Sequence, residues 1–231
     1  MWTRKELKEK GKVAFKRNYW KCVLVGFILI LLTGATAGSS AGNGNLKELQ
    51  TDLNAAASQV GVSVGTIVGI LFGIMGVALL ISLAISIFLR NPLLVGVKRF
   101  FLKNAEEPAT IKELIYSFTQ GHYLKTVGAL LLMTIFVSLW SLLFVIPGII
   151  KMYDYYLVKF ILADDPEMSA MDALRKSKEM MRGHRWNTFV LNLSFIGWQL
   201  LGVFTCGIVN IFYVKPYMEA TDAELYLTLK K

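Results

Sequence analysis

The chain has 231 residues, of which 55% are hydrophobic and only 18% are charged, and its formal net charge is +9. Soluble domains are roughly 45 to 50% apolar and about 25% charged, so this composition indicates a protein that faces lipid. We expect the positive charge to meet anionic lipid head groups, because no soluble surface of the right size remains for a nucleic-acid-binding patch. The composition therefore excludes nucleic acid as a partner.

Several apolar runs are long enough to cross a bilayer, which takes about 20 residues in a helix. The sequence predicts a single integral membrane domain of the all-α class, a polytopic transmembrane bundle. We expect six membrane segments, at approximately 19–38, 60–89, 122–146, 148–163, 186–204 and 207–226. The fourth is apolar but carries Lys151, Asp154 and Lys159, and the fifth is followed by Thr205-Cys206-Gly207.

Basic residues are distributed unevenly along the chain. Seven precede the first span and an eighth, Lys21, lies at its start, whereas the loop 39–59 contains one, Lys47. Further basic residues follow the second span in 90–125 and precede the fifth in 164–185. The positive-inside rule places all of these basic segments in the cytoplasm, so 148–163 has to return across the membrane. The same rule predicts a second return near the end of the chain, because basic residues cluster there at Lys215, Lys230 and Lys231. Both termini are then expected on the cytoplasmic side of a bacterial plasma membrane.

The start of the chain has an alternative interpretation. The first span is followed by Ala35-Thr36-Ala37, which fits a signal-peptide cleavage site. The charged leader is long and carries helix-forming signals that a disposable segment does not need, which favours a retained span. The loop 39–59 is expected to face outward as a turn and a short helix.

Three similar segments lead into apolar runs and suggest a threefold repeat of a charged helix followed by a membrane hairpin. The alternative is that basic and aromatic residues simply recur at membrane interfaces. A capping box is predicted at Thr3 and another at Thr110, and Asp165-Pro166 is predicted to start a third charged helix. The aligned segments are Asn18-Tyr19-Trp20-Lys21-Cys22, His122-Tyr123-Leu124-Lys125-Thr126 and His184-Arg185-Trp186-Asn187-Thr188.

The third charged helix is predicted to be amphipathic and to lie on the cytoplasmic side. Ala170, Met171, Leu174, Ser177 and Met181 share one face at helical spacing. Such a helix either packs under the bundle or senses membrane charge, and packing is the simpler interpretation. A glycine after this run, at position 183, is expected to stop the helix.

The second span carries Gly65, Gly69 and Gly73 at four-residue spacing. Residues without side chains on one helix face allow a neighbouring backbone to come close. The neighbour is either another helix of the same chain or a second copy, so a homo-oligomer or another membrane-protein partner stays open.

No catalytic, metal-binding or cofactor-binding motif is present in the sequence. The two histidines, His122 and His184, occupy matched positions and favour a structural role at the interface. Cys22 and Cys206 share no short spacing and suggest neither a disulfide nor a metal site. We therefore expect a protein that is not an enzyme and holds no cofactor.

The strongest functional candidate is a polar intramembrane site in the fourth segment, formed by Lys151, Asp154, Tyr155 and Lys159. Ionisable residues at membrane depth usually line a cavity or pair with one another. Lys151 and Asp154 are three residues apart and can neutralise each other on one helix face. The alternative is that this helix lies at the interface, with its lysines and tyrosines at head-group level.

Several motifs of the second half of the chain recur in a known family. They are the block from Ile146-Pro147-Gly148-Ile149-Ile150-Lys151 to Tyr156, Ala173-Leu174-Arg175-Lys176-Ser177, Met181-Arg182-Gly183-His184 and, most specifically, Leu193-Ser194-Phe195-Ile196-Gly197-Trp198 and Lys215-Pro216-Tyr217. Through these motifs most of the chain resembles the uncharacterised membrane proteins of Gram-positive bacteria grouped as domain of unknown function 975. The resemblance implies a multi-pass membrane protein without an established activity, and it implies no catalytic residues.

Two hypotheses for function follow from these features. The first is a non-enzymatic scaffold or accessory that acts on lipid or a membrane partner, motivated by the glycine face and the amphipathic helix. The second is a transporter of a small solute, an ion or a lipid, motivated by Lys151, Asp154 and the neighbouring tyrosines. The position of Asp154, in a hydrated cavity or among head groups, would discriminate between them.

Overall fold

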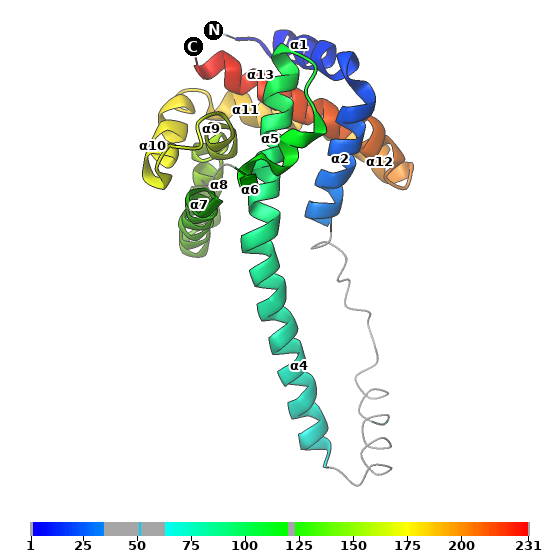
Figure 1. Ribbon diagram of the computed structural model, residues 1–231, viewed down its shortest axis with the longest axis vertical. Coiled ribbons are helices and arrows are strands. Elements are labelled where there is room, and N and C mark those ends of the chain that lie inside the picture. Colours follow the sequence, from blue (N-terminus) through cyan, green and yellow to red (C-terminus); the bar gives the residue numbers. More distant parts are fainter. Residues whose placement is uncertain (1, 35–50, 52–62, 120–122, 231) are drawn as a thin grey trace. The chain divides into compact units, whose positions relative to one another are not determined.

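The computed structural model describes residues 2–34, 51, 63–119 and 123–230. Every element within these ranges is helical, which confirms the all-α class (Figure 1). The chain divides into two compact units, one made of Met1–Leu32 with Arg90–Lys231 and the other of Thr33–Leu89. The proposed cleavage site, His122 and nearly all of the loop 39–59 lie outside the described residues.

The second unit contains α4 (Val64–Ile85), which begins at an N-cap serine. Ser63 Oγ accepts a hydrogen bond from the backbone N–H of Thr66 at 3.3 Å. A Cβ atom placed on Gly69 or Gly73 would meet no described atom within 4 Å, and one on Gly65 would meet only Ser63 Oγ at 3.8 Å. The glycine face of α4 is therefore open in the described part of the chain, and its close packing stays a prediction.

The first unit is built around α5, which packs against α1, α7, α9, α13, η2 and α6 (Figure 1). Two helices from the opposite ends of the chain, α1 and α13, also pack against each other. The elements outside α4 are α1 (Arg4–Arg17), α2 (Tyr19–Gly34), η1 (Ser86–Arg90), α5 (Asn91–Glu106), η2 (Ile111–Ile115), α6 (Tyr116–Thr119), α7 (Tyr123–Leu143), α8 (Val145–Asp154), α9 (Val158–Asp164), α10 (Ala170–Met180), α11 (Arg185–Leu193), α12 (Ile196–Phe204), η3 (Asn210–Val214) and α13 (Lys215–Lys230).

Large apolar side chains from these helices meet in one core. Phe15 of α1, Phe100 of α5, Phe160 of α9 and Tyr226 of α13 are each 1% exposed or less. The rings of Phe160 and Tyr226 stack with centroids 5.8 Å apart. Each buried aromatic ring removes a large apolar surface from water, so this core holds the ends of the chain against its middle.

A polar contact fixes the junction of α1 and α2 to the end of α5. The guanidinium of Arg17 donates hydrogen bonds of 2.7, 2.8 and 3.0 Å to the carbonyls of Asn104, Ala105 and Glu106. These are carbonyls of the last turn of α5, which have no partner within the helix and attract positive charge. Asn104 is fully buried, and its side chain bonds the Ala14 carbonyl and the Asn18 amide at 2.8 and 2.9 Å.

The helix-start predictions are confirmed in one case and wrong in two. Thr3 Oγ1 accepts from the Glu6 N–H at 3.3 Å, as predicted. Thr110 precedes a 3-10 helix and its hydroxyl makes no capping hydrogen bond, because the Glu113 N–H donates to the Thr110 carbonyl at 3.2 Å, while the Glu113 carboxylate pairs with cationic side chains of α5. Helix α10 starts four residues after Pro166, because Ser169 takes the cap position and accepts from the Asp172 N–H at 3.2 Å.

Three predicted segments contain internal breaks. The segment 122–146 is interrupted at Phe144, where α7 ends and α8 begins, 148–163 is divided into α8 and α9 by a turn, and 186–204 is divided into α11 and α12 at Ser194 and Phe195. The buried hydroxyl of Ser177, on α10, holds the break between α8 and α9, because it donates to the Asp154 carbonyl at 2.7 Å and accepts from the Leu157 N–H at 3.3 Å. The predicted end of α10 is confirmed, since Gly183 has φ of +80°.

Among the residues that the structure describes, three helices are long and apolar enough to cross a membrane. They are Gly65–Glu106, Tyr123–Leu143 and Arg185–Phe204, and a shorter apolar helix covers Tyr19–Thr33. The most apolar 18-residue window of Gly65–Glu106 contains no buried residue. Apolar surface of that extent in a helix of this length is typical of contact with lipid or with another membrane helix. The chain therefore has the features of a membrane protein.

Candidate functional site

Asp154 ends α8 and is enclosed by two cations. Its carboxylate lies 3.6 Å from Lys151 Nζ and 2.5 Å from Arg185 Nε, and the residue is only 1% exposed. The contact with Arg185 is an ion pair and not an aligned hydrogen bond. The predicted pairing of Lys151 with Asp154 is present, and Arg185 is an addition that sequence spacing did not reveal.

Lys151, one of the two cations of this cluster, also contacts an aromatic ring. Lys151 Nζ lies 5.0 Å from the centroid of the Trp140 ring, on α7. A cation over an aromatic face is stabilised by the ring quadrupole. The cluster therefore joins α7, α8 and α11, and two positive charges face one negative charge.

The other two residues of the predicted site lie elsewhere. Tyr155 is 9% exposed and packs into the apolar core. Lys159 lies on α9, where its electrostatic neighbours are Lys98, Glu219 and Arg90. Lys151 and Asp154 thus lie in one cluster and Lys159 in another, while Tyr155, in the break between α8 and α9, belongs to neither.

The cluster around Lys159 is an ionic network between α5, α9 and α13. Lys98 Nζ is 2.6 Å from Glu219 Oε2, with side-chain exposures of 14% and 11%, and it lies 4.7 Å from the Phe160 ring centroid. The attraction between two buried opposite charges offsets the cost of removing each from water. Loss of one member therefore destabilises the fold far more than loss of both, because it leaves a buried charge without a partner. In the sequence, Lys98 is one of several basic residues in 90–125 that are expected in the cytoplasm. The apolar residues Val97 and Phe100 beside it indicate a buried position.

Tyr156 connects this network to α11. Its hydroxyl donates to Asp222 Oδ2 at 2.7 Å and lies 3.3 Å from Asn192 Oδ1. Asp222 is 7% exposed and sits one helical turn after Glu219 on α13. Glu219 and Asp222 are thus held at the inner face of α13, the first by Lys98 of α5 and the second by Tyr156 of the turn between α8 and α9.

An apolar pocket of about 380 Å³ lies between α8 and α11. Its lining includes Arg185, so it adjoins the Asp154 cluster directly. The remaining lining side chains are Ile149, Ile150, Tyr153, Trp186 and Phe189. The pocket combines an aromatic and aliphatic floor with one cation at its edge.

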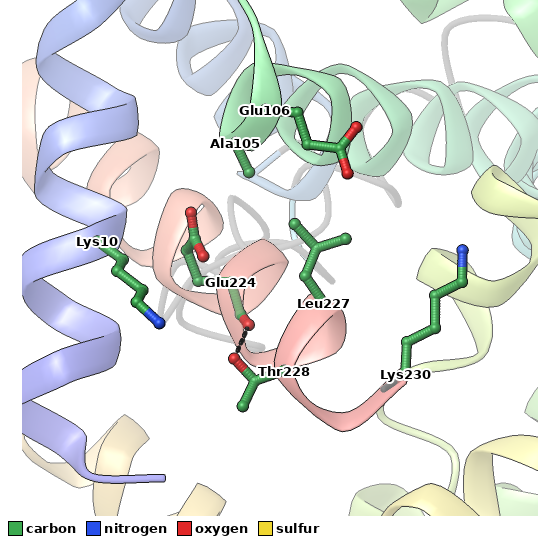
Figure 2. Close-up of a pocket in the computed structure, with 7 residues that line it drawn as sticks. All are labelled: Lys10, Ala105, Glu106, Glu224, Leu227, Thr228 and Lys230. Atoms are coloured by element: carbon green, nitrogen blue, oxygen red, sulfur yellow. Dashed lines mark hydrogen bonds between the residues drawn. The ribbon is translucent and has the colours of Figure 1, made fainter.

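A second pocket of about 440 Å³ lies where α1, α5 and α13 meet (Figure 2). Figure 2 shows Leu227 between Lys10 and Lys230, with the Thr228 hydroxyl donating to the Glu224 carbonyl at 2.8 Å. Both lysines have partners, since Lys10 pairs with Glu6 at 2.8 Å and Lys230 with Asp164 at 2.6 Å. Ala105 and Glu106 complete the lining, so its acids and bases balance and it has no strong preference for either sign of ligand charge.

Asp164 ties the carboxyl end of the chain to α9. Lys230 Nζ lies 2.6 Å and the Tyr226 hydroxyl 2.8 Å from Asp164 Oδ2. Burial raises the pKa of Asp164, but the hydrogen bonds from Lys230 and Tyr226 outweigh that effect and leave the pKa below its ordinary value. The carboxylate is therefore charged at neutral pH and acts as an anchor.

Metal-ligating residue types are scattered in the part of the chain that the structure describes. Within 2–34, 63–119 and 123–230, no three histidine, cysteine, aspartate or glutamate side chains are grouped so that they could hold a metal ion. His184 contacts the Trp2 ring with centroids 5.9 Å apart, which joins the start of the chain to the start of α11. The chemistry of the site is that of paired charges and apolar contacts.

Residues 142–231 match a family described as Protein of unknown function (DUF975). The match confirms the resemblance over the second half of the chain, and it covers both the Asp154 cluster and the acidic residues of α13. No curated protein and no solved structure matches the chain. The family supplies no activity, so the function has to be argued from the geometry.

Proposed function

We propose that this chain is a multi-pass protein of a bacterial plasma membrane that acts, without catalysis, as a scaffold or accessory on lipid or a membrane partner. The observation that carries the proposal is the exposure of its most apolar helix, where an 18-residue window of Gly65–Glu106 contains no buried residue. Such a surface needs a hydrophobic occupant, which the bilayer or another membrane helix supplies. A soluble partner or a nucleic acid offers no matching surface.

The proposed topology has six membrane segments, with both termini in the cytoplasm. Three candidate spans and the shorter helix Tyr19–Thr33 account for four of them. The other two are α8 with α9 and the stretch from η3 into α13, each of which is an apolar or interrupted helix between basic segments. The threefold repeat is part of this proposal, and it is supported by the starts of α2, α7 and α11 within the aligned segments.

The enclosure of Asp154 favours the scaffold over a transporter. A carboxylate that carries an ion or a proton has to be reached by it, whereas Asp154 is 1% exposed and contacts two cations of the same chain. Transport is the alternative, and the ionic network of Lys98, Glu219 and Asp222 is the observation that favours it, because charges enclosed by apolar helices are often functional.

Flux measurements in proteoliposomes separate the two functions. We expect vesicles with the full chain to release ions, small solutes and labelled lipid no faster than vesicles without protein. The matched variants are Asp154→Asn, in the Lys151 cluster, and Lys98→Met with Glu219→Met, which removes a complete charge pair. Flux by the wild-type chain that either variant abolishes would overturn the scaffold in favour of the transporter.

Photocrosslinking tests whether the exposed surface of α4 contacts lipid or a membrane protein. A photoreactive residue at Ile74, which is 62% exposed beside the glycine face, should form an adduct with lipid or with a membrane protein in intact membranes. The same group at Val13, 66% exposed on α1, is the control for a polar surface. Equal adducts at both positions would contradict a role for the α4 surface.

A further inference from the structure

The pocket between α8 and α11 has a preformed apolar floor. The ring centroids of Trp186 and Phe189 are 5.3 Å apart, and those of Tyr153 and Phe189 are 6.1 Å apart. Ile149 and Ile150 complete the floor and are 47% and 44% exposed. Exposed aliphatic side chains beside fixed aromatic rings form a surface that a flexible hydrocarbon chain can cover without rearrangement of the protein.

One edge of the pocket carries excess positive charge. Lys151 and Arg185 together face the single carboxylate of Asp154, which leaves one positive charge uncompensated within this cluster. The Nε atom of Arg185 is buried against Asp154, while 37% of the side chain is exposed. A guanidinium engaged along one edge can still bind a phosphate through its remaining N–H groups.

The charged end of the pocket lies at the end of a candidate span, where lipid head groups are expected. Arg185 is the first residue of the candidate span Arg185–Phe204, and Trp186, 71% exposed, follows it. Tryptophan is enriched at the level of lipid head groups, and basic side chains at the ends of spans extend toward the same level. Arg185 is therefore expected at head-group level, and the apolar side chains that line the pocket lie on α8 and α11.

We propose that this pocket binds an anionic phospholipid, with its phosphate at Arg185 and part of one acyl chain against Ile149, Ile150 and Phe189. The inference rests on the proposed membrane function and names the lipid class that the protein recognises. The volume of about 380 Å³ is within the range of small-ligand pockets, roughly 300 to 1,000 Å³, so it accommodates a segment of one chain. The negative phosphate of the lipid thus meets the cation at the edge of the pocket, and the hydrocarbon next to it meets the apolar floor.

Tryptophan fluorescence gives a direct test. The full-length protein is titrated in detergent with phosphatidylglycerol whose acyl chains are brominated, and with phosphatidylcholine carrying the same chains. Bromine quenches a nearby indole, and Trp186→Phe identifies the contribution of the pocket. We expect half-maximal quenching of Trp186 at an about tenfold lower proportion of phosphatidylglycerol, the ratio that one charge-assisted hydrogen bond supports.

Variants of the pocket locate the binding. Ile150→Tyr should fill the floor and reduce the affinity for phosphatidylglycerol about tenfold, whereas Leu142→Tyr, at a site 89% exposed on α7, should leave it unchanged. Because Arg185 and Lys151 both face Asp154, the charge is tested by Arg185→Gln combined with Lys151→Met and Asp154→Asn, which removes every charge of the cluster. This triple variant should bind the two lipids equally.

The outcomes distinguish this inference from the proposed function. Equal quenching by the two lipids, or Ile150→Tyr behaving as Leu142→Tyr does, would overturn lipid recognition at this pocket. Competition by free glycerol phosphate at equal strength would assign a soluble phosphate to Arg185 and overturn the acyl-chain contact. A loss of oligomeric mass on Ile150→Tyr, with quenching unchanged, would assign the pocket to a second copy. A chain that alkaline carbonate extracts from vesicles would contradict the membrane function itself.

Discussion

Asn104 shows how one side chain connects three parts of the chain. It is fully buried, and its amide reaches the Ala14 carbonyl while its oxygen accepts from Asn18. Its own carbonyl accepts from Arg17. A buried polar group costs free energy unless it is hydrogen-bonded, so the position depends on all of these partners at once.

Replacement of Asn104 by alanine should therefore destabilise the fold. Asn104→Ala leaves the Ala14 carbonyl and the Asn18 amide without this partner, and we expect a loss of about 1 to 3 kcal/mol in the free energy of unfolding. The unfolding temperature in detergent measures the effect. Asn187→Ala, at a half-buried asparagine of α11 outside this contact, is the matched control. An unchanged unfolding temperature in Asn104→Ala would show that the contact contributes nothing net.

Asp164 should make stability depend on pH in the acidic range. Its pKa is lowered in the folded chain, so the unfolded state binds a proton more readily and protonation favours unfolding. The stabilisation is complete above the pKa of the unfolded aspartate, about 3.9, and it is lost as the pH falls through the lower folded pKa. Unfolding temperatures measured between about pH 6 and pH 3 should thus fall more steeply in wild type than in Asp164→Asn.

An exposed acid provides the control for this pH effect. Glu167 pairs with Lys125 at 3.2 Å, and its side chain is 67% exposed. Ion pairs at such exposure contribute little, so Glu167→Gln should keep the wild-type slope. If Asp164→Asn also kept that slope, the anchor between α9 and the carboxyl end would be without energetic effect.

At the scale of the helices, close approach depends on glycine at particular crossings. A Cβ atom on Gly11 of α1 would lie 2.7 Å from Thr221 Oγ1 and 2.8 Å from Thr221 Cα on α13. The backbone atom cannot move away as a flexible side chain can. The crossing of α1 and α13 therefore requires a residue without a side chain, whereas the glycines that sequence spacing emphasised lie on the open face of α4.

Gly11→Ala tests this crossing. Overpacking at a helix contact costs about 1 to 3 kcal/mol, so the unfolding temperature in detergent should fall. Gly73→Ala adds the same methyl group where no described atom lies within 4 Å, and alanine favours the helix more than glycine does, so this variant should not lower the unfolding temperature. A fall in Gly73→Ala alone would place the packed glycine face on α4 instead.

Local spacing predicted the cap of the first helix but not the contacts at Thr110. The Glu6 N–H donates to Thr3 Oγ1 at 3.3 Å, whereas the Glu113 N–H donates to the Thr110 carbonyl at 3.2 Å. The Glu113 carboxylate pairs with Arg99 at 2.9 Å and Lys103 at 2.7 Å, two residues of another helix. Local spacing describes the partners within one turn, and it contains nothing about a cation delivered by a distant segment.

For the whole molecule, the proposed topology can be measured by cysteine labelling. In a chain with Cys22→Ser and Cys206→Ser, a membrane-impermeant maleimide should reach Asn43→Cys in intact cells. It should reach Lys5→Cys, Lys178→Cys and Lys231→Cys only after permeabilisation, because each lies in a segment that the positive-inside rule keeps in the cytoplasm. Labelling of Lys231→Cys from outside would indicate an odd number of crossings.

The sequence by itself determined the helical class and the apolar helices that are long enough to cross a membrane. Hydrophobic runs and their lengths are local properties, so the helices at Gly65–Glu106, Tyr123–Leu143 and Arg185–Phe204 follow from composition. The i, i+3 pair of Lys151 and Asp154 was equally visible, since both lie on one turn. The tertiary structure decided what these charges meet.

Only that structure brings Arg185 to Asp154, separates Lys159 from both, and pairs Lys98 with Glu219 across 121 residues of chain. The physical reason is that a buried charge is stabilised by whichever opposite charge the packing delivers, and packing joins helices that are far apart in sequence. Helix periodicity therefore predicted which side chains share a face, while the choice of partner across helices depended on the fold.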